Sequence, residues 1–573
     1  MLNQKIAKIF EEIADLLEMQ DIQFKPRAYR KAAISIRSLS EDIKDIYKKG
    51  GVDALEKIPG VGKSMALKID EMIKTGKIKY YEELKKKMPA AVSELVAIEG
   101  VGPKIVKKLY QKLKIRTIND LEKAAQAGKI RKIRGLGPKV EQNILEGIAI
   151  VRKRTKRFLL GFTLLDAQEI KKELEKFPGV EKVDLAGSIR RGKETIGDID
   201  ILAIAKKPKA VVNCFIHLPQ VERILAAGPT KGAVILKNGA DCDLRVLKKE
   251  SYGAALMYFT GSKAHNIKIR KIAQSHHWKL SEYGLFSKKK KIAGRTEEEV
   301  FKKLGLSYIE PELREDRGEV EAAQQHKLPK LVVRKDIKGV FHVHSKWSRG
   351  DATGEIIDIA RKCKQMGWQY VSMADHVGTL RIAGGMTEKE LLSQKKEIEQ
   401  VNKQIKNFKI LTGCEANILK DGRIDISDKV LAQLDVVIAA VHSHFKMGKQ
   451  EMTKRIIRAM KNKNVDIIAH PTGRIIQERE PYQVDLEKIM TAAVEYNVVL
   501  EINAFPDRLD LKDTDIKLAI EHGCKLSIGL DAHNLDQLHH IDLGLITARR
   551  GWAERKDIIN TFSWQKVLKL FSG

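Results

Sequence analysis

GSIRRGKETIGDID, residues 187–200, is the stretch from which the rest of the chain is interpreted. It holds a Gly-Ser pair, two arginines, and two aspartates one residue apart, and it follows a short apolar run at residues 183–186 that is typical of a strand. A Gly-Ser turn can bring backbone N–H groups close to an anion, and two aspartates at alternate positions of a strand point to the same side. The stretch therefore predicts a site for a metal–phosphate complex.

The length and the charge set the first limits. A chain of 573 residues predicts about three to five domains. The formal net charge is +31, from 106 Lys and Arg against 75 Asp and Glu, and most of the excess lies in residues 1–330. This excess indicates a polyanionic partner, most simply nucleic acid, although a lysine-rich solvated surface would have the same composition.

The cysteine spacing and the hydropathy indicate the cellular compartment of the protein. Five cysteines occur without CxxC spacing, so that neither a disulfide framework nor a thiolate zinc site is expected. No signal-peptide core is recognisable at the N-terminus, and no apolar run reaches the roughly 18 residues that span a bilayer. We expect a cytoplasmic protein without membrane contact, and a monomer by default.

Three related segments precede the opening stretch: IPGVGKSMALKI at 58–69, IEGVGPKIVKKL at 98–109 and IRGLGPKVEQNI at 133–144. Each resembles a helix-hairpin-helix, in which two glycines allow a tight hairpin and the next helix binds a DNA phosphate with its N-terminal amides. A purely structural repeat is the alternative. The residues predicted to bind DNA are Gly60, Gly62, Lys63, Gly100, Gly102, Lys104, Gly135, Gly137 and Lys139.

Residues 25–77 also resemble the N-terminal lyase domain of family X DNA polymerases. The resemblance implies that Lys68 would attack an abasic sugar as a Schiff base, and that Lys25 and Tyr29 would hold a 5′-phosphate. Such a lysine needs a lowered pKa. The alternative is that Lys68 only faces a phosphate or solvent, so that 5′-deoxyribose-phosphate lyase activity stays open.

The opening stretch matches the nucleotidyltransferase signature of the family X palm, with a third carboxylate at Asp243 in ADCDLRVL. The resemblance implies that Asp198, Asp200 and Asp243 hold two Mg²⁺ (or Mn²⁺) ions, which activate the primer 3′-hydroxyl and steady the leaving pyrophosphate. It also implies phosphate contacts from the Gly187 backbone, Ser188 and Arg191, whereas Arg190 would be structural.

Residues 258–266, YFTGSKAHN, resemble the nucleotide-binding segment of the same family. The resemblance implies that Tyr258 and Phe259 crowd the sugar 2′ position and that Asn266 reaches the minor-groove edge of the base. Gly261, Ser262 and Lys263 complete the expected segment. Two positions depart from many relatives: Asp241 stands where they carry arginine, and Lys263 replaces an acidic residue.

Beyond a charged boundary at residues 310–335, short apolar runs alternate with helical patterns. Seven strand candidates predict a parallel βα barrel, with its chemistry at the carboxyl ends of the strands. They are residues 339–343, 370–374, 410–413, 435–441, 466–469, 498–503 and 525–530.

Histidines and carboxylates recur at these strand ends and resemble the ligands of a PHP (polymerase and histidinol phosphatase) domain. The resemblance implies three divalent metals, Mn²⁺, Zn²⁺ or Fe²⁺, that supply a metal-bound hydroxide, with His344 also counted as catalytic. Asp375 and His444 would orient the ligands. The nine ligand positions are His342, His344, Asp351, His376, Glu415, His442, His470, Asp531 and His533.

The resemblance covers essentially the whole chain and is closest to bacterial and archaeal family X DNA polymerases. It implies a multidomain fold: all-α helix-hairpin-helix domains, an α+β nucleotidyltransferase palm with a thumb, and a distorted (βα)7 barrel. The expected parts are a lyase-like domain at 1–88, a second helical domain at 89–155, the palm and nucleotide-binding region at 156–315, a linker at 316–335 and the PHP domain at 336–573.

The expected function is a DNA-directed DNA polymerase that fills short gaps in repair, with a 3′–5′ exonuclease or 3′-end phosphoesterase in the PHP domain. Its partners would be gapped or primer–template DNA and deoxynucleoside triphosphates. Two alternatives stay open: mainly a PHP phosphoesterase or abasic-site endonuclease with the front half as a DNA clamp, and a non-enzymatic DNA-binding scaffold.

Overall fold

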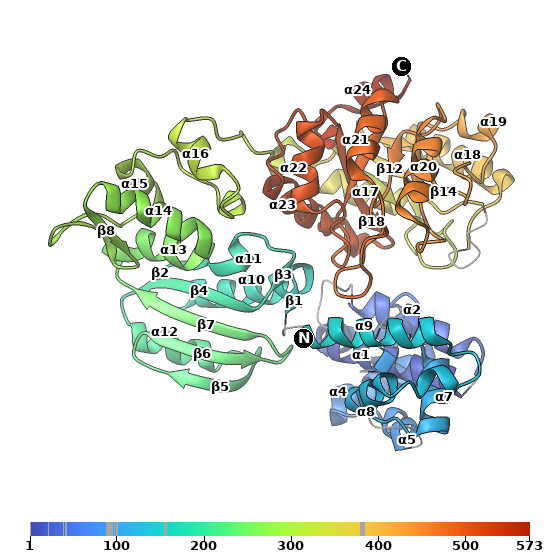
Figure 1. The fold of residues 1–573 in the computed structure, drawn as a ribbon, viewed down its shortest axis with the longest axis horizontal. Coiled ribbons are helices and arrows are strands. Elements are labelled where there is room, and N and C mark those ends of the chain that lie inside the picture. The colour runs from blue at the N-terminus through green and yellow to red at the C-terminus, as the bar shows by residue number, and fades with distance from the viewer. Residues whose placement is uncertain are drawn as a thin grey trace. The chain divides into compact units, whose positions relative to one another are not determined.

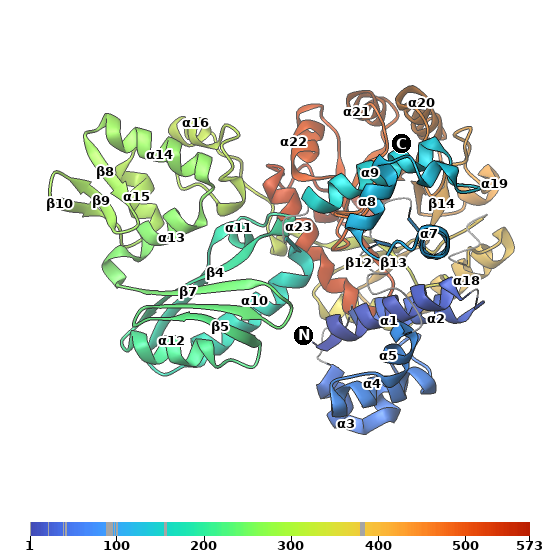
Figure 2. The same cartoon turned by 60° about the horizontal axis from the view of Figure 1, so that its bottom comes forward.

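A computed structural model describes residues 2–20, 22–37, 39, 43–86, 95, 96, 98, 101–153, 157–378 and 384–572. The chain divides into two compact units. The first comprises Met1–Lys156 with Gln477–Arg479, and the second comprises Arg157–Ile476 with Glu480–Gly573 (Figures 1 and 2). No helix among the described residues is long and apolar enough to cross a membrane.

The described secondary structure of residues 1–156 in the first unit consists of helices. Its first helix buries Ile6, Phe10, Ile13 and Leu17 on one face, because these residues recur at helical spacing. The elements are α1 (Leu2–Met19), α2 (Lys25–Arg37), α3 (Ile43–Glu56), α4 (Lys63–Thr75), α5 (Lys79–Lys86), α7 (Pro103–Leu113), α8 (Ile118–Gln126), η1 (Ile130–Lys132) and α9 (Pro138–Lys153).

Each of the three glycine-rich segments leads directly into a helix, α4, α7 or α9. Gly60 and Gly135 have φ of 77° and 87°, a conformation that favours glycine. Gly62 and Gly102 are the N-cap residues of α4 and α7 and supply no side-chain cap, so the first amides of both helices are open to an anion. Gly100 lies outside the described residues.

The second unit begins with the palm, a five-stranded sheet in the order β2-β4-β7-β6-β5. Helices α10 and α12 pack against it (Figure 1). The elements are β1 (Phe158–Leu159), α10 (Leu160–Lys176), β2 (Val180–Leu185), α11 (Gly187–Arg190), β3 (Thr195–Ile196), β4 (Asp198–Ala205), α12 (Pro208–Ile216), β5 (Val221–Ala227), β6 (Lys231–Leu236) and β7 (Asp241–Leu247).

The thumb follows, with its own apolar core around Phe301 and a small antiparallel sheet in the order β10-β9-β8. Its elements are η2 (Lys249–Ser251), α13 (Tyr252–Thr260), α14 (Lys263–Ser275), β8 (Trp278–Ser281), β9 (Gly284–Ser287), β10 (Lys290–Ala293), α15 (Glu297–Lys303), η3 (Pro311–Leu313) and α16 (Glu319–Gln324). Helix α16 lies inside the segment that was expected to be a linker, and Leu331 of that segment forms a β-bridge with Glu554.

The C-terminal part is a nearly closed parallel barrel in the order β13-β12-β11-β18-β17-β16-β15-β14. Strands β13 and β14 follow each other across Thr412, so the eight named strands occupy seven positions, and the predicted (βα)7 fold class is confirmed. The strands are β11 (Gly339–Val343), β12 (Tyr370–Met373), β13 (Lys409–Leu411), β14 (Gly413–Asn417), β15 (Val436–Ala440), β16 (Ile467–Ile468), β17 (Val499–Asn503) and β18 (Leu526–Ala532).

The strands of this barrel are buried on both faces, as expected when helices cover a parallel sheet from outside. The helices of this part of the chain are η4 (Arg334–Asp336), α17 (Ile356–Gln365), α18 (Glu388–Gln404), α19 (Asp428–Leu431), α20 (Lys449–Met460), α21 (Leu486–Glu495), α22 (Asp513–Glu521), η6 (Leu535–His540), α23 (Ile541–Arg550), η7 (Ile559–Thr561) and α24 (Trp564–Phe571). Helices α18 to α23 are labelled in Figure 2.

Candidate functional site

The three predicted palm carboxylates lie together on one face of the sheet. Strand β4 pairs with β7 in parallel, and the register places Asp200 opposite Asp243 and Asp198 opposite Asp241. Because side chains alternate along a strand, all four carboxylates point to the same side. The sequence therefore predicted the grouping, and the register adds Asp241 as a fourth acidic neighbour.

The carboxylates of this face repel one another, and Asp200 shows the result. Burial, together with the charges of Asp198 and Asp243, raises the pKa of Asp200 to about 6. The Nζ atom of Lys231 lies 3.0 Å from Oδ2 of Asp243 and offsets part of the negative charge. A group of oxygen donors with unbalanced negative charge suits Mg²⁺ or Mn²⁺, so the residues present fit the predicted ions.

The Gly-Ser turn touches this carboxylate face. Gly187 begins α11 with φ of 63°, and a Cβ atom on it would lie 2.6 Å from Oδ2 of Asp200. The backbone N–H of Ala186 donates to the carbonyl of Asp200 at 2.8 Å. Glycine is thus required at position 187, and the Ser188 end of the turn is held beside the predicted metal ligands.

The two arginines after the turn have different partners. Arg190 donates to both carboxylate oxygens of the buried Glu297, at 2.9 and 2.6 Å, as a structural ion pair would. Arg191 donates through Nε to Oε1 of Glu315 at 2.9 Å and through Nη1 to the carbonyl of Thr260. Arg191 therefore joins the turn to the end of α13, where the predicted nucleotide-binding segment begins.

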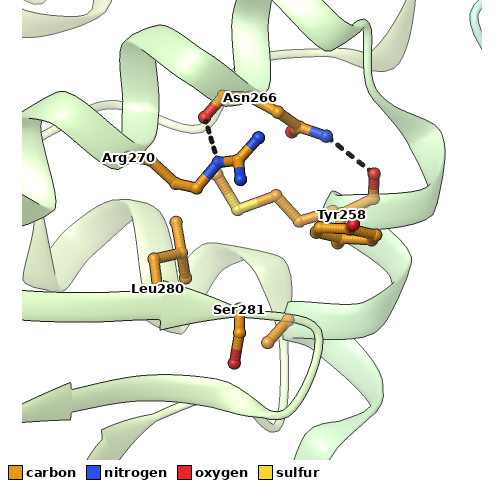
Figure 3. Close-up of a pocket in the computed structure, with 7 residues that line it drawn as sticks. Tyr258, Asn266, Arg270, Leu280 and Ser281 are labelled. Atoms are coloured by element: carbon orange, nitrogen blue, oxygen red, sulfur yellow. Dashed lines mark hydrogen bonds between the residues drawn. The ribbon is translucent and has the colours of Figure 1, made fainter.

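That segment packs around a small pocket lined by residues of α13, α14 and β8 (Figure 3). Nδ2 of Asn266 donates to the carbonyl of Tyr258 at 2.7 Å, and Nε of Arg270 donates to the carbonyl of Asn266 at 3.2 Å. The rings of Tyr258 and Phe259 meet edge to face, with 5.2 Å between their centroids.

The remaining residues of the segment connect α13 to α14. Ser262 caps α14, with its hydroxyl accepting from the backbone N–H of His265, and Lys263 is the first residue of that helix. A Cβ on Gly261 would lie 3.2 Å from Nη1 of Arg191. The structure therefore places residues 258–266 directly beside the arginine end of the Gly-Ser turn.

The histidines and carboxylates predicted at the barrel strand ends converge on Glu415. Its Oε2 lies 2.9 Å from Nδ1 of His376 and 3.4 Å from Nε2 of His342, and its Oε1 lies 3.1 Å from Nε2 of both His442 and His470. A single buried carboxylate thus reaches four histidines, which is an arrangement expected of a bridging metal ligand.

The other predicted ligands extend this cluster. Oδ2 of Asp351 lies 3.6 Å from Nε2 of His376 and 3.6 Å from Nε2 of His533, and Oδ1 of Asp531 lies 3.5 Å from Nε2 of His344. Three trios have ligand atoms within 4.8 Å of one another: His344, His376 and His533; His342, His344 and Glu415; and His376, Glu415 and His442.

Buried atoms without a hydrogen-bond partner indicate whether divalent metals fit between these side chains. Several buried ligand atoms have no hydrogen-bond partner in the part of the chain that the structure describes, among them Nε2 of His342, Nε2 of His344 and Oδ1 of Asp351. A buried polar atom without a partner is costly. Nitrogen and oxygen atoms left open toward one another suit Mn²⁺, Zn²⁺ or Fe²⁺, so the donor set fits divalent metals.

Two residues that no sequence motif indicated, Glu501 and Asn503, form hydrogen bonds with the predicted ligands. Glu501 accepts from Nδ1 of His342 at 2.5 Å and from the backbone N–H of His470 at 2.7 Å. Asn503 donates to Oδ2 of Asp531 at 3.2 Å. Both lie on β17 at alternate positions, so the strand pattern of residues 498–503 could have drawn attention to them.

Two residues of barrel loops, Asp375 and Arg508, also contact the cluster or its neighbours. Asp375 accepts from the hydroxyls of Ser345 and Ser348, and Ser348 in turn accepts from the N–H of His376 at 3.0 Å, so Asp375 acts on a ligand through Ser348. Arg508, which no motif indicated, has its Nε 3.3 Å from Oδ2 of Asp531.

His444 lies elsewhere than expected for an orienting residue. It is exposed and lines a cavity of about 470 Å³ that also contains His442, Asn417, Lys420 and Arg423. Nδ1 of His442 is 2.6 Å from the side-chain oxygen of Asn417, and that amide orients the His442 ring. The cavity opens beside the histidine–carboxylate cluster, and its wall carries Lys420 together with Arg423, whose Nε donates to Oδ2 of Asp421 at 2.6 Å.

The candidate lyase residues lie in the first unit. Nζ of Lys68 donates to the hydroxyl of Ser64 at 2.9 Å and sits 5.0 Å above the ring of Tyr80. Burial lowers the pKa of Lys68, and the charge of Lys25 lowers it further, although Glu71 acts against them. Tyr29 is buried against Phe10.

Four segments of the chain match known family models. Residues 1–78 match "Helix-hairpin-helix domain", 92–149 match "SAM-like Helix-hairpin-helix tandem", 255–315 match "DNA polymerase beta thumb" and 341–505 match "PHP domain".

Whole proteins are also similar. The DNA polymerase/3′-5′ exonuclease PolX of Bacillus subtilis (strain 168) is 37% identical over 576 residues, which cover 99% of each chain. A probable phosphatase of Thermoanaerobacter sp. (strain X514) is 33% identical over 202 residues, 34% of this chain and 77% of the relative. DNA polymerase lambda of Arabidopsis thaliana is 26% identical over 348 residues, 54% of this chain and 61% of the relative.

Proposed function

This chain belongs to the family X DNA polymerases that carry a C-terminal PHP domain. From this premise we propose which residues of the palm and of the barrel carry out each of its two reactions. It is a DNA polymerase that fills short gaps and a 3′–5′ exonuclease. The observation that carries the polymerase site is the β4–β7 register, which aligns Asp198, Asp200 and Asp243 beside the Gly187 turn. The match over the whole chain sets aside the clamp and scaffold alternatives.

At the palm, the three aspartates would hold two divalent ions, which lower the pKa of a primer 3′-hydroxyl and stabilise the departing pyrophosphate. Gly187 and Ser188 offer the first amides of α11 to the phosphates, and Arg191 supplies a positive charge at the end of the same turn. Residues Tyr258 to Asn266 would hold the sugar and base of the incoming nucleotide, because they lie beside Arg191.

At the barrel, the nine predicted ligands would hold divalent metals that supply a hydroxide for attack on the terminal phosphodiester. Glu501 fixes His342 by accepting from its Nδ1, so that Nε2 stays free to coordinate. Lys420, on the wall of the cavity beside His442, would attract the DNA backbone, whereas the nearby Arg423 is paired with Asp421.

We propose gapped or primer–template DNA and deoxynucleoside triphosphates as partners of the whole chain. The helices α4, α7 and α9 would grip the DNA backbone through their N-terminal amides and the lysines Lys63, Lys104 and Lys139. Mg²⁺ or Mn²⁺ would serve the palm, and three ions of Mn²⁺, Zn²⁺ or Fe²⁺ the barrel.

Two single substitutions test the division of labour. Asp198→Ala should abolish primer extension on gapped DNA and leave 3′ degradation with Mn²⁺ intact. His342→Ala should do the reverse, and its content of bound transition metal, measured by mass spectrometry, should fall. Extension that survives Asp198→Ala would rule out the palm assignment, and degradation that survives His342→Ala would rule out the barrel assignment.

A further inference from the structure

One face of barrel helix α23 packs against the palm rather than against the barrel alone. Leu543 and Ile546, three residues apart on the helix, belong to the same apolar cluster as the palm sheet. A Cβ on Gly161 would lie 2.9 Å from Cδ1 of Leu543, and a Cβ on Gly192 would collide with Ile546. The palm glycines at these two positions thus allow a close approach of α23.

Arg550 lies on the same helix, four residues after Ile546, and is buried, with 3% of its side chain exposed. Its Nη1 donates to the backbone carbonyl of Arg191 at 2.5 Å and to Oε1 of Glu315 at 3.1 Å, and its Nη2 donates to Oδ2 of Asp513 at 2.6 Å. One guanidinium from the barrel therefore holds the palm loop, the end of the thumb and helix α22.

Glu315 is shared between two arginines. The same Oε1 that accepts from Arg550 also accepts from Nε of Arg191 at 2.9 Å. Burial favours the neutral acid, but the charges of Arg191 and Arg550 outweigh it, so that the pKa of Glu315 is lowered. An ionised Glu315 thus lies between the residue predicted to bind nucleotide phosphate and a residue of the barrel.

We propose that Arg550, although it lies in the PHP domain, is a positioning residue for the polymerase reaction. It fixes the carbonyl at the end of the turn formed by residues 187–191 and shares Glu315 with Arg191, so that the amides and guanidinium of this turn face the triphosphate. The proposal rests on the proposed function of the palm.

The turn depends on outside support because α11 is only four residues long and cannot keep its shape by its own hydrogen bonds. Without Arg550, the Arg191 carbonyl loses a buried donor, and Glu315 pairs with Arg191 alone. The first change would loosen the backbone of the turn, and the second would hold the Arg191 guanidinium more tightly on Glu315. Both would make Arg191 less available to an incoming phosphate. A second contact supports the loop further along: Nη2 of Arg474 in the barrel lies 2.8 Å from Oε2 of Glu194.

The test is single-nucleotide gap filling at saturating DNA, with the deoxynucleotide concentration varied, in full-length protein. Arg550→Ala should raise KM for the nucleotide about tenfold and change kcat much less. Arg550→Lys should give an intermediate KM, because an ammonium can replace some but not all of the three contacts. The matched control is Arg549→Ala, which removes contacts with Glu312 at 2.7 Å and with the Val332 carbonyl at 3.1 Å but leaves the palm turn untouched.

Exonuclease rates on single-stranded DNA, measured in the same preparations, should equal those of the wild type and show that the barrel is intact. A KM for Arg550→Ala within twofold of wild type would overturn the proposal, and so would an equal rise in Arg549→Ala. If Arg550→Ala does not fold, a wild-type KM in Arg550→Lys overturns it and a raised one supports it. Extension that survives Asp198→Ala would instead remove the proposed function itself.

Discussion

At the scale of single residues, Asp200 is the palm carboxylate whose ionisation is disfavoured by its surroundings. Its carboxylate is partly buried between Asp198 and Asp243. Burial and these two charges disfavour its ionised form and raise its pKa to about 6. Divalent ions bound to these carboxylates would relieve the repulsion. Asp200 is therefore expected to cost stability in exchange for activity.

Asp200→Asn should stabilise the protein in EDTA at pH 7.5 by on the order of 2 kcal/mol and abolish extension. The folded-state pKa lies above the unfolded value of 3.8, so wild-type stability falls as the pH rises from about 4 through 6. The advantage of the variant should therefore shrink toward pH 4. Urea denaturation at both pH values measures it, and a variant less stable than the wild type at pH 7.5 contradicts the prediction.

Lys68 is the second residue whose surroundings alter its chemistry. Because burial and Lys25 lower its pKa, more of its amine is neutral at pH 8 than for an ordinary lysine. Borohydride should therefore trap a covalent adduct with an incised abasic DNA, and both Lys68→Ala and Lys68→Arg should lose it. Lys68→Arg keeps the charge and should bind the same DNA normally. An undiminished adduct in either variant would show that Lys68 is not the nucleophile.

At the scale of elements, we expect the glycine hairpins to present helix N-termini to DNA. Lys63→Ala, at the start of α4, should weaken binding to gapped DNA of any sequence and reduce the slope of log affinity against log salt by about 1. Lys74, near the other end of α4 and paired with Asp70 at 2.9 Å, provides the control. Fluorescence anisotropy at several salt concentrations measures the DNA affinity of Lys63→Ala and of the control Lys74→Ala. Equal slopes in the two variants would refute the role of the first residues of α4.

Strand β17 supports the predicted metal ligand His342 through Glu501. Glu501→Gln removes the carboxylate that accepts from Nδ1 of His342 and should lower metal affinity, and with it the exonuclease rate, about 10- to 100-fold, with extension unchanged. Glu495→Gln, an exposed position at the end of α21, should behave like the wild type. Wild-type metal affinity in Glu501→Gln would show that His342 does not need this partner.

At the scale of the whole molecule, the palm and the barrel share apolar surface within the second unit. Ile476, Leu509, Leu543 and Ile546 of the barrel complete the palm cluster. A chain cut to residues 1–335 should therefore expose that face, unfold at a lower temperature and lose extension. Full-length His342→Ala should keep extension. Normal gap filling by the shortened chain would show that the palm does not need the barrel.

The sequence by itself determined the local chemistry of both sites. Alternation along a strand put Asp198 and Asp200 on one side, and the strand-end rule for parallel barrels predicted that the histidines around Glu415 would meet. The first follows from the two-residue period of a strand and the second from polar residues that directly follow apolar runs, and both patterns are visible in the order of residues.

Only the tertiary structure decided which distant residues support those sites. Glu315 is 124 residues from Arg191, Arg550 is 359 residues from it, and Glu501 is 159 residues from His342. No periodicity links such pairs, because their contact depends on how separate sheets and helices pack after each has formed. Residues 187–200 could be recognised as a metal–phosphate site from their order alone, whereas their dependence on a helix of the barrel arises from that packing.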